Sequence, residues 1–583
     1  MDVERYDTVG AAGCAVRQCL RAALLLACIL AGCGGTGRFV PPPPFPDDRE
    51  DIPEPSVREY HITADLFDKQ FTEQIEQTFD FSRQARNLFG KRKEAFNVDA
   101  FDEVPNSSWF TNRNARRRMT IEEIARGPDV TGGPDPSTPW VITRAKSEGV
   151  TPGFHIKDGN GNRYLIKFDP RGYSELVTGA EVISTKIFYA AGYHVPGNYI
   201  VYFDPAILRL GEDVKFTDEK GRKRLMTNGD LKSILDSLEI LPDGRIRALA
   251  SKYIPGIPKG PFKYHGVRKD DPNDIVPHQH RRELRGLRVI AAWLNHVDTK
   301  SGNSFDSYVT VGDKSYLRHY LIDFGSTLGS AAHGPMKPKT GHENQVDPHE
   351  ILLNIITLGL YVRSYEKMEG VRYPSVGLYE SELFDPGGFK FSVPNPAFES
   401  CTALDGFWGA KIVMSFTDEQ LETAVAQGLY SDPEAAHYIL RVLKERRDKT
   451  GRHWFSKVNP LDRFELVESV DGGQRICFVD LAVDGGLESA AQTRYRYDLR
   501  IGGRLVVEGR EVRTGTCIEL PDRAEQKDLV RKVSDDTQEG EQWEIRIQTR
   551  RTSKGRWSRW IKVFLSVGEE TGGFGLLGID RQH

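Results

Sequence analysis

The sequence predicts an α+β protein in which a β-rich region is followed by an α-rich region and then by an all-β domain. Three observations support this order. Short apolar strands dominate residues 140–256, apolar residues recur at helical spacing through 257–462, and alternating strands separated by turns fill 463–583. Alternation with a period of two indicates strands, whereas recurrence every three to four residues indicates helices. Strands that precede helices in one region favour the α+β class.

The composition is that of an ordinary globular protein. The chain has 583 residues, enough for several domains of about 100–200 residues each. Hydrophobic residues make up 39% of it, charged residues make up 28%, and the formal net charge is -4. Because nucleic-acid-binding domains are usually strongly basic, this charge argues against nucleic acid as a partner.

The first residues predict export. Arg17 and Arg21 precede an apolar run, residues 22–29, which closes with Leu30-Ala-Gly-Cys33. The run is shorter than the roughly 20 apolar residues that a spanning helix needs, so residues 1–33 are interpreted as a signal peptide. The ending resembles the lipobox of bacterial lipoproteins. That resemblance implies a lipid on Cys33 and a membrane-bound chain, on the periplasmic side of the outer membrane where a cell has two membranes.

The next segments connect this anchor to the body. Residues 34–58 are rich in Gly and Pro and predict a flexible, then stiff tether that holds the body off the membrane. Residues 59–139 predict a mostly helical extension, clearest from Leu66 to Leu88, and carry no chemical motif. Its basic cluster, Arg113–Arg118, is interpreted as a solvated face. A later apolar stretch, Ile351–Val362, is too short to span a membrane and predicts a core helix.

The β-rich region contains a hairpin and a helix. The segment Asp158-Gly-Asn-Gly-Asn162 separates two apolar runs and predicts their turn, because Gly and Asn tolerate positive φ. Downstream, one apolar stripe at helical spacing predicts a helix that Gly192 ends. The stripe consists of Ala180, Ile183, Ser184, Ile187, Phe188 and Ala191.

Two short motifs carry the chemistry. After a predicted helix at residues 281–295 comes His296-Val-Asp298-Thr-Lys300-Ser-Gly-Asn303, and Asp323-Phe-Gly325 ends a short apolar strand. A carboxylate such as Asp298 can orient an acceptor hydroxyl, and a lysine such as Lys300 can neutralise a transferring phosphoryl group. Asn303 and Asp323 supply the oxygens that a magnesium ion needs.

In order and local spacing these motifs resemble the catalytic loop and metal-binding tripeptide of protein kinases. The resemblance implies a two-lobed kinase-like domain, with an N-lobe and hinge at 140–256 and a C-lobe at 257–462. Tyr164-Leu-Ile-Lys167 resembles the kinase strand that ends in the phosphate-binding lysine. Strand alternation places Leu165 on the same face as Lys167, where it would cover the adenine.

The same resemblance implies an ion pair for Lys167, with Glu181 or Glu175 as its partner. The helix that follows looks like the corresponding helix of HipA-like and phosphatidylinositol-kinase-like proteins. The hinge would be Lys252-Tyr253-Ile-Pro-Gly256, whose backbone would contact adenine. The implied ligands are ATP and Mg²⁺ or Mn²⁺, and the reaction transfers the γ-phosphate to a hydroxyl of an unidentified protein, lipid or sugar.

Several departures from the kinase pattern leave a second function open. The Gly-rich loop is replaced by the segment 147–153, and Val297 stands where kinases carry arginine. ATP is also scarce outside the cytoplasm. The alternative is therefore a non-catalytic envelope protein that uses the kinase-like domain and the C-terminal β-sandwich as binding surfaces.

Residues 463–583 predict a β-sandwich, and their short alternating strands resemble immunoglobulin-like or fibronectin type III modules. Cys477 and Cys517 both lie in strand-like runs, and an exported chain permits a disulfide between them. In that case Cys401 would be a buried thiol.

Overall fold

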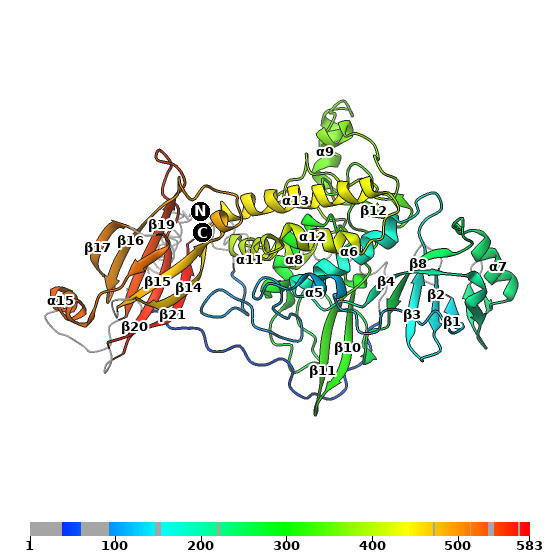
Figure 1. Ribbon diagram of the computed structural model, residues 1–583, viewed down its shortest axis with the longest axis horizontal. Helices are drawn as coiled ribbons and strands as arrows, with labels where there is room; N and C mark the ends of the chain where they lie inside the picture. Colours follow the sequence, from blue (N-terminus) through cyan, green and yellow to red (C-terminus); the bar gives the residue numbers. More distant parts are fainter. Residues whose placement is uncertain are drawn as a thin grey trace, which may run out of the picture.

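The fold is described from a computed structural model over residues 38–59, 93–145, 153–217, 222–469, 473–512, 515–533, 542–568 and 572–582. The signal peptide, the proposed lipid site Cys33 and the helix expected at 66–88 lie outside these ranges. Among the described helices, none combines the length and the apolar character that crossing a membrane requires. The order of elements along the chain is a β-rich part, a mainly helical part and an all-β part (Figure 1).

The segment 38–59 packs along the body, contrary to the expectation of a free tether. The ring of Phe39 stacks on that of Phe564 with a centroid distance of 4.2 Å. The amide of Ile52 donates to the carbonyl oxygen of Ser315 at 2.9 Å. Figure 1 shows this segment in blue, running from the C-terminal strands to the hairpin of β10 and β11. Its Pro-rich composition indicates an extended chain but does not predict that Phe39 and Ile52 contact distant strands.

Residues 93–139 contain a single described helix, α5 (Ile121–Arg126), so the mostly helical extension is wrong over this range. A capping box holds α5, with Thr120 and Glu123 each accepting from the other's backbone. Within the basic cluster, the guanidinium of Arg113 lies 4.0 Å from the centroid of the Tyr189 ring and donates to two carbonyl oxygens. Arg113 therefore packs against Tyr189 and is not part of a solvated face.

The β-rich part is a six-stranded mixed sheet in the order β4-β8-β3-β2-β1-β5, with β1 and β5 parallel. The predicted hairpin at 158–162 is confirmed, because β2 and β3 pair in register around it. One face carries the core of Phe154, Ile156, Tyr164 and Ile166, and Lys167 lies on the opposite face. The strands are β1 (Trp140–Ala145), β2 (Gly153–Lys157), β3 (Arg163–Lys167), β4 (Asn198–Phe203), β5 (Leu208–Leu210) and β8 (Ile246–Lys252).

Helix α6 (Leu176–Ala191) follows β3 and is buried along almost its whole length. As predicted, Gly192 ends it, with a φ of 124°. A side chain at Gly192 would also meet the Phe110 ring at 2.2 Å, so glycine is required here for two reasons. The β-rich part is completed by α7 (Asn228–Asp236) and the two-stranded β6 (Lys215–Thr217) and β7 (Lys223–Leu225).

The helical part is built around α8 (Arg282–Trp293) and α11 (Ala403–Met414). These helices approach closely because Gly409 lies against the backbone of Gly286, where a Cβ would come within 2.8 Å of the Gly286 carbonyl oxygen. The remaining helices are α9 (Pro348–Ile356), α10 (Pro396–Glu399), α12 (Asp418–Ala426) and α13 (Pro433–Phe455). The strands are β9 (Ile257–Pro258), β10 (Ser304–Val311), β11 (Lys314–Leu321), β12 (Ser330–Ala331) and β13 (Gly334–Pro335).

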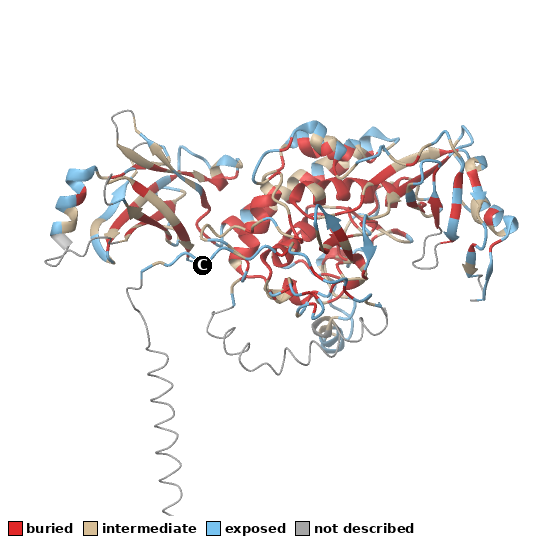
Figure 2. Cartoon of the chain, turned by 90° about the horizontal axis from the view of Figure 1, so that it is seen from below, coloured by how far each residue is buried: buried red, intermediate tan, exposed pale blue. Residues whose placement is uncertain are grey.

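The C-terminal part consists of two antiparallel sheets, in the orders β14-β15-β18 and β17-β16-β19-β20-β21. Their shared apolar core is consistent with a β-sandwich. The bounds are β14 (Leu461–Glu468), β15 (Gln474–Asp480), β16 (Arg494–Ile501), β17 (Arg504–Glu511), β18 (Cys517–Glu519), β19 (Trp543–Arg550), β20 (Ile561–Val567) and β21 (Phe574–Arg581), with helices α14 (Leu481–Asp484) and α15 (Arg523–Val533). Buried residues mark the interiors of both the helical part and this sandwich (Figure 2).

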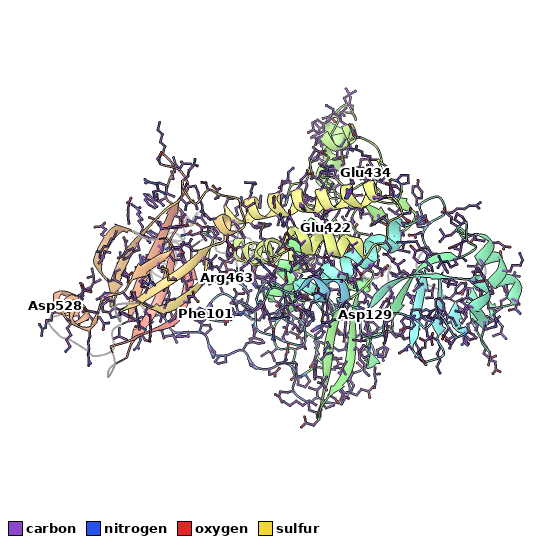
Figure 3. The ribbon with its side chains drawn as sticks, in the orientation of Figure 1. Phe101, Asp129, Glu422, Glu434, Arg463 and Asp528 are labelled. Carbon is purple, nitrogen blue, oxygen red and sulfur yellow. A yellow bond between two sulfur atoms is a disulfide. The ribbon has the colours of Figure 1, made fainter. Side chains whose placement is uncertain are left out.

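A disulfide joins Cys477 of β15 to Cys517 of β18, which confirms that pairing. Cys401 keeps its thiol and is buried, as expected. Buried ion pairs hold the sandwich against the helical part, with Asp462 contacting both Lys411 at 3.0 Å and Arg581 at 2.8 Å. Phe101 packs against the sandwich core at this junction (Figure 3).

Candidate functional site

Lys167 ends β3 and lies at the centre of the site. Its Nζ donates to Glu181 Oε1 at 2.9 Å, to Glu181 Oε2 at 3.0 Å and to Asp323 Oδ1 at 2.9 Å. Burial alone would lower the pKa of this ammonium, but the charges of Asp323 and Glu181 outweigh it and the pKa is raised. Lys167 is therefore a cation held between two carboxylates from distant parts of the chain.

The partner on α6 is Glu181 and not Glu175. Glu175 sits at the N-cap of α6 with a φ of 71°, and its carboxylate accepts from the amide of Ser431 at 3.0 Å. Asp169 caps the helix instead, by accepting from the amides of Val177 and Thr178. This cap places Glu181 almost two turns into the helix, where its side chain is buried beneath Lys167.

The loop after α8 holds the second group of predicted residues. Asn303 Nδ2 donates to the backbone oxygen of Asp298 at 2.7 Å and to Asp298 Oδ2 at 3.0 Å. Lys300 Nζ lies 3.0 Å from the same carboxylate oxygen. No described residue donates a hydrogen bond to Asn303 Oδ1, so that oxygen keeps its acceptor capacity. The loop thus fixes Asp298 through one amide and one ammonium.

Asp323 follows β11 at a backbone position that few residues adopt. Its φ is 63°, in the left-handed region that Asp and Asn tolerate best after Gly, and its side chain is 54% exposed. The amide of Ile322 donates to the carbonyl oxygen of Asn303 at 3.0 Å, which ties the Asp323 turn to the loop 296–303. A Cβ on Gly325 would come within 2.9 Å of Val177, so only glycine lets this turn lie against α6.

Phe324 pins that turn to the helix that carries Glu181. Its ring is fully buried, stacks on Phe188 of α6 at 4.7 Å and meets His296 edge-on at 5.7 Å. Burial lowers the pKa of His296, while the nearby carboxylates of Asp298 and Asp323 oppose that shift. Both aspartates therefore lie close to one buried imidazole, which connects the two motifs in space.

Leu165 and Tyr253, the residues expected around the nucleotide base, lie on β3 and directly after β8, which pairs with β3. Leu165 is half-buried and pairs across strands with His155, so both side chains share the face of Lys167. Tyr253 Oη lies 2.6 Å from His155 Nδ1. The Tyr253 amide donates to the carbonyl oxygen of Arg163 at 3.0 Å, so this amide is not available to a base. Tyr253 therefore cannot donate its amide to a base, contrary to the expectation for the hinge, because strand pairing uses this donor.

His155 is the residue that sequence reasoning missed. It lies on β2 directly opposite Leu165 and also contacts Arg144 Nη2 at 2.9 Å. The hairpin at 158–162 sets this register, so counting back from the turn could have placed His155 on the Lys167 face.

The donor set suits a hard divalent cation shared with phosphates. Asp323 offers an exposed carboxylate and Asn303 an amide oxygen, which are ligands that Mg²⁺ prefers while it keeps waters and phosphate oxygens. Within the described ranges, no cluster of three or more His, Cys, Asp and Glu side chains could hold a metal alone. The arrangement fits phosphoryl-transfer chemistry, in which a lysine, a metal-binding pair and an oriented carboxylate act together.

Among known proteins, solved structures show similarity to this chain. No family model matches the sequence, and no curated protein does. Two solved structures of a golgi casein kinase, one of them with Mn/ADP bound, are similar to this chain. They cover 71% of it and 95% and 93% of their own chains, at 12% and 11% identity and a TM-score of 0.25.

Proposed function

We propose that this chain is an exported, lipid-anchored phosphotransferase that moves the γ-phosphate of ATP to a hydroxyl acceptor in a two-lobed kinase-like domain. The observation that carries the proposal is Lys167, held between Glu181 and Asp323 at 2.9 Å from each. In protein kinases the phosphate-binding lysine pairs with a helix glutamate and lies beside the metal-binding aspartate, and Lys167 has both kinds of neighbour. The half-exposed Asp323 carboxylate supports the proposal, because an exposed oxygen remains accessible to a metal ion.

Each residue then has a role in the transfer. Asp298 orients the acceptor hydroxyl and takes its proton, while Lys300 beside it offsets charge on the moving phosphoryl group. Asn303 and Asp323 would hold Mg²⁺ or Mn²⁺, which supplies charge neutralisation between the β- and γ-phosphates. Leu165 and Tyr253 would border the base. The acceptor is a hydroxyl of an envelope protein, lipid or sugar.

A transfer assay tests this function. Purified full chain is incubated with γ-labelled ATP, Mg²⁺ and a cell-envelope extract, and label is measured in protein, lipid and sugar fractions. We expect label in one fraction with the wild type and its loss with Asp298→Asn, whose shape is unchanged. The matched control is Asp204→Asn, an exposed turn residue of the same domain. ATP binding without transfer to any fraction would instead favour the non-catalytic envelope protein.

The lipid anchor has its own test. Cells that express the chain are grown with radiolabelled palmitate, and the protein is isolated. We expect label on the wild type and none on Cys33→Ala, since Cys33 is the thiol that ends the lipobox. Equal labelling of the two chains would contradict lipidation at Cys33.

A further inference from the structure

The segment 351–362 stands out from the body as an apolar tip. It comprises the end of α9 and the turn that follows, and Figure 1 shows α9 projecting beyond α13. Leu358 is 86% exposed and Leu360 is 82% exposed. The other large apolar side chains that are half exposed or more are Ile351, Leu352, Ile355, Ile356, Tyr361 and Val362. The prediction of a core helix here is therefore wrong, because the apolar side chains of the segment face outward.

Polar contacts at the base of the tip hold its two ends in place. Arg363 is largely buried, and its guanidinium donates to Glu350 at 2.8 Å and to Asn354 at 2.8 Å. Tyr365 stacks on His342 with a centroid distance of 5.1 Å. These contacts close the two ends of the segment on each other and leave its apolar side chains outside.

Soluble monomers rarely expose a contiguous apolar patch of this kind, so we expect a binding partner to cover the tip. The twelve residues from 351 to 362 include no charged side chain. Gly359, with a φ of 75°, makes the sharp turn that separates the two most exposed leucines. The tip is thus convex and uncharged, with Tyr361 at the border to the polar base. This arrangement suits the membrane–water interface, where aromatic rings are enriched.

A second copy of the chain fits the tip less well than a bilayer does. A stable protein interface usually engages about 20–30 residues a side, roughly twice the number in this segment. The lipid anchor would also bring a bilayer close to the C-terminal sandwich. Phe39 is fixed on Phe564, and the six residues from Cys33 to Phe39 span at most about 20 Å when extended. A lipid on Cys33 would therefore hold the body close to the membrane surface.

We propose that the apolar tip 351–362 inserts into the interfacial layer of the bilayer that carries the lipid anchor. Apolar side chains that bind at the interface enter about 5–10 Å, which suits a short helix with leucines at its turn. The contact would give the body a second attachment and fix its orientation on the membrane. It rests on the lipid anchor proposed at Cys33 but needs no catalytic activity, so its failure is distinguishable from a failure of phosphotransfer.

A tryptophan probe tests the insertion. Leu360→Trp and, as a matched control, the 79% exposed Val130→Trp are made in the full chain, which is reconstituted into vesicles of phosphatidylethanolamine and phosphatidylglycerol. Brominated lipid quenches tryptophan in the bilayer, and the wild-type signal is subtracted from each variant. We expect quenching at position 360 to exceed that at 130 several-fold. Equal quenching at the two positions would overturn the proposal. So would emission from position 360 that shifts with protein concentration in the absence of lipid, which is the signature of a second copy.

Discussion

The ammonium of Lys167 lies 2.9 Å from the carboxylate of Asp323, although 156 residues separate them in the chain. The contact joins the end of β3 to the turn after β11, so the β-rich and helical parts meet at this point. Glu181 completes the arrangement from α6. The predictions below follow from this meeting of three elements and from the buried groups around it.

Removing the Lys167 side chain should destabilise the protein more than removing the ion pair altogether. Lys167→Met leaves the Glu181 carboxylate buried without this cation, and we expect the free energy of unfolding to fall by about 3–5 kcal/mol. Adding Glu181→Leu removes that carboxylate and should restore most of the loss. Urea denaturation of the single and double variants checks this. A double variant no more stable than Lys167→Met would contradict a buried pair.

Asp323→Asn should keep the fold and abolish the response to magnesium nucleotide. Asn tolerates the positive φ of Asp323, so the turn survives, but the neutral amide is a poor magnesium ligand. We expect Mg²⁺ with ATP to raise the thermal midpoint of the wild type and not of the variant. Asp213→Asn, at another exposed positive-φ aspartate, is the matched control and should respond like the wild type.

Stability should fall as the pH drops below about 6.5. Burial, helped by nearby Arg113 and Arg318, lowers the pKa of His194 to about 3, and burial with Arg285 lowers the pKa of His280 to about 4. Between these values and the unfolded pKa near 6.5, the unfolded chain binds more protons, so acid favours unfolding.

Replacing one of these groups gives the test of that pH dependence. His194→Gln should flatten the fall in unfolding free energy between pH 6.5 and 4, as measured by urea denaturation at a series of pH values. His437→Gln, at an exposed histidine, should leave the curve unchanged. An unaltered slope in His194→Gln would show that this imidazole is already protonated in the folded protein.

Reduction should weaken the C-terminal sandwich. The disulfide between Cys477 and Cys517 closes a loop of 40 residues, and losing such a bridge costs roughly 2–5 kcal/mol. We expect a reductant to lower the thermal midpoint of the wild type. The reductant should not lower the thermal midpoint of the double variant Cys477→Ala, Cys517→Ala, because this variant has no disulfide. Sensitivity of this variant to reductant would mean that another thiol is involved.

The sequence was informative wherever local spacing reflects a chemical or geometric requirement. The turn at 158–162 set the register of β2 and β3, and the spacing from His296 to Asn303 put Asp298 and Asn303 on one loop, where a hydrogen bond joins them. Helical periodicity located α6 and its end at Gly192. The choice between Glu181 and Glu175 stayed open, because it depends on which residue caps α6, and that residue is Asp169.

Other features depend on long-range packing that no local pattern encodes. The segment 38–59 has a linker composition, yet Phe39 and Ile52 find partners in distant strands. The run 351–362 has the pattern of a core helix, but the polar contacts of Arg363 turn it outward. The role of His155 depends on strand pairing, which places it beside Leu165.

The most direct test of the phosphotransfer site is calorimetric titration of the purified full chain with ATP, with and without Mg²⁺. The site of Lys167, Asn303 and Asp323 predicts saturable binding that requires the metal, with a dissociation constant below about 1 mM, the upper end of ordinary enzyme–substrate affinities. No binding of ATP at that concentration, with either Mg²⁺ or Mn²⁺, would contradict it.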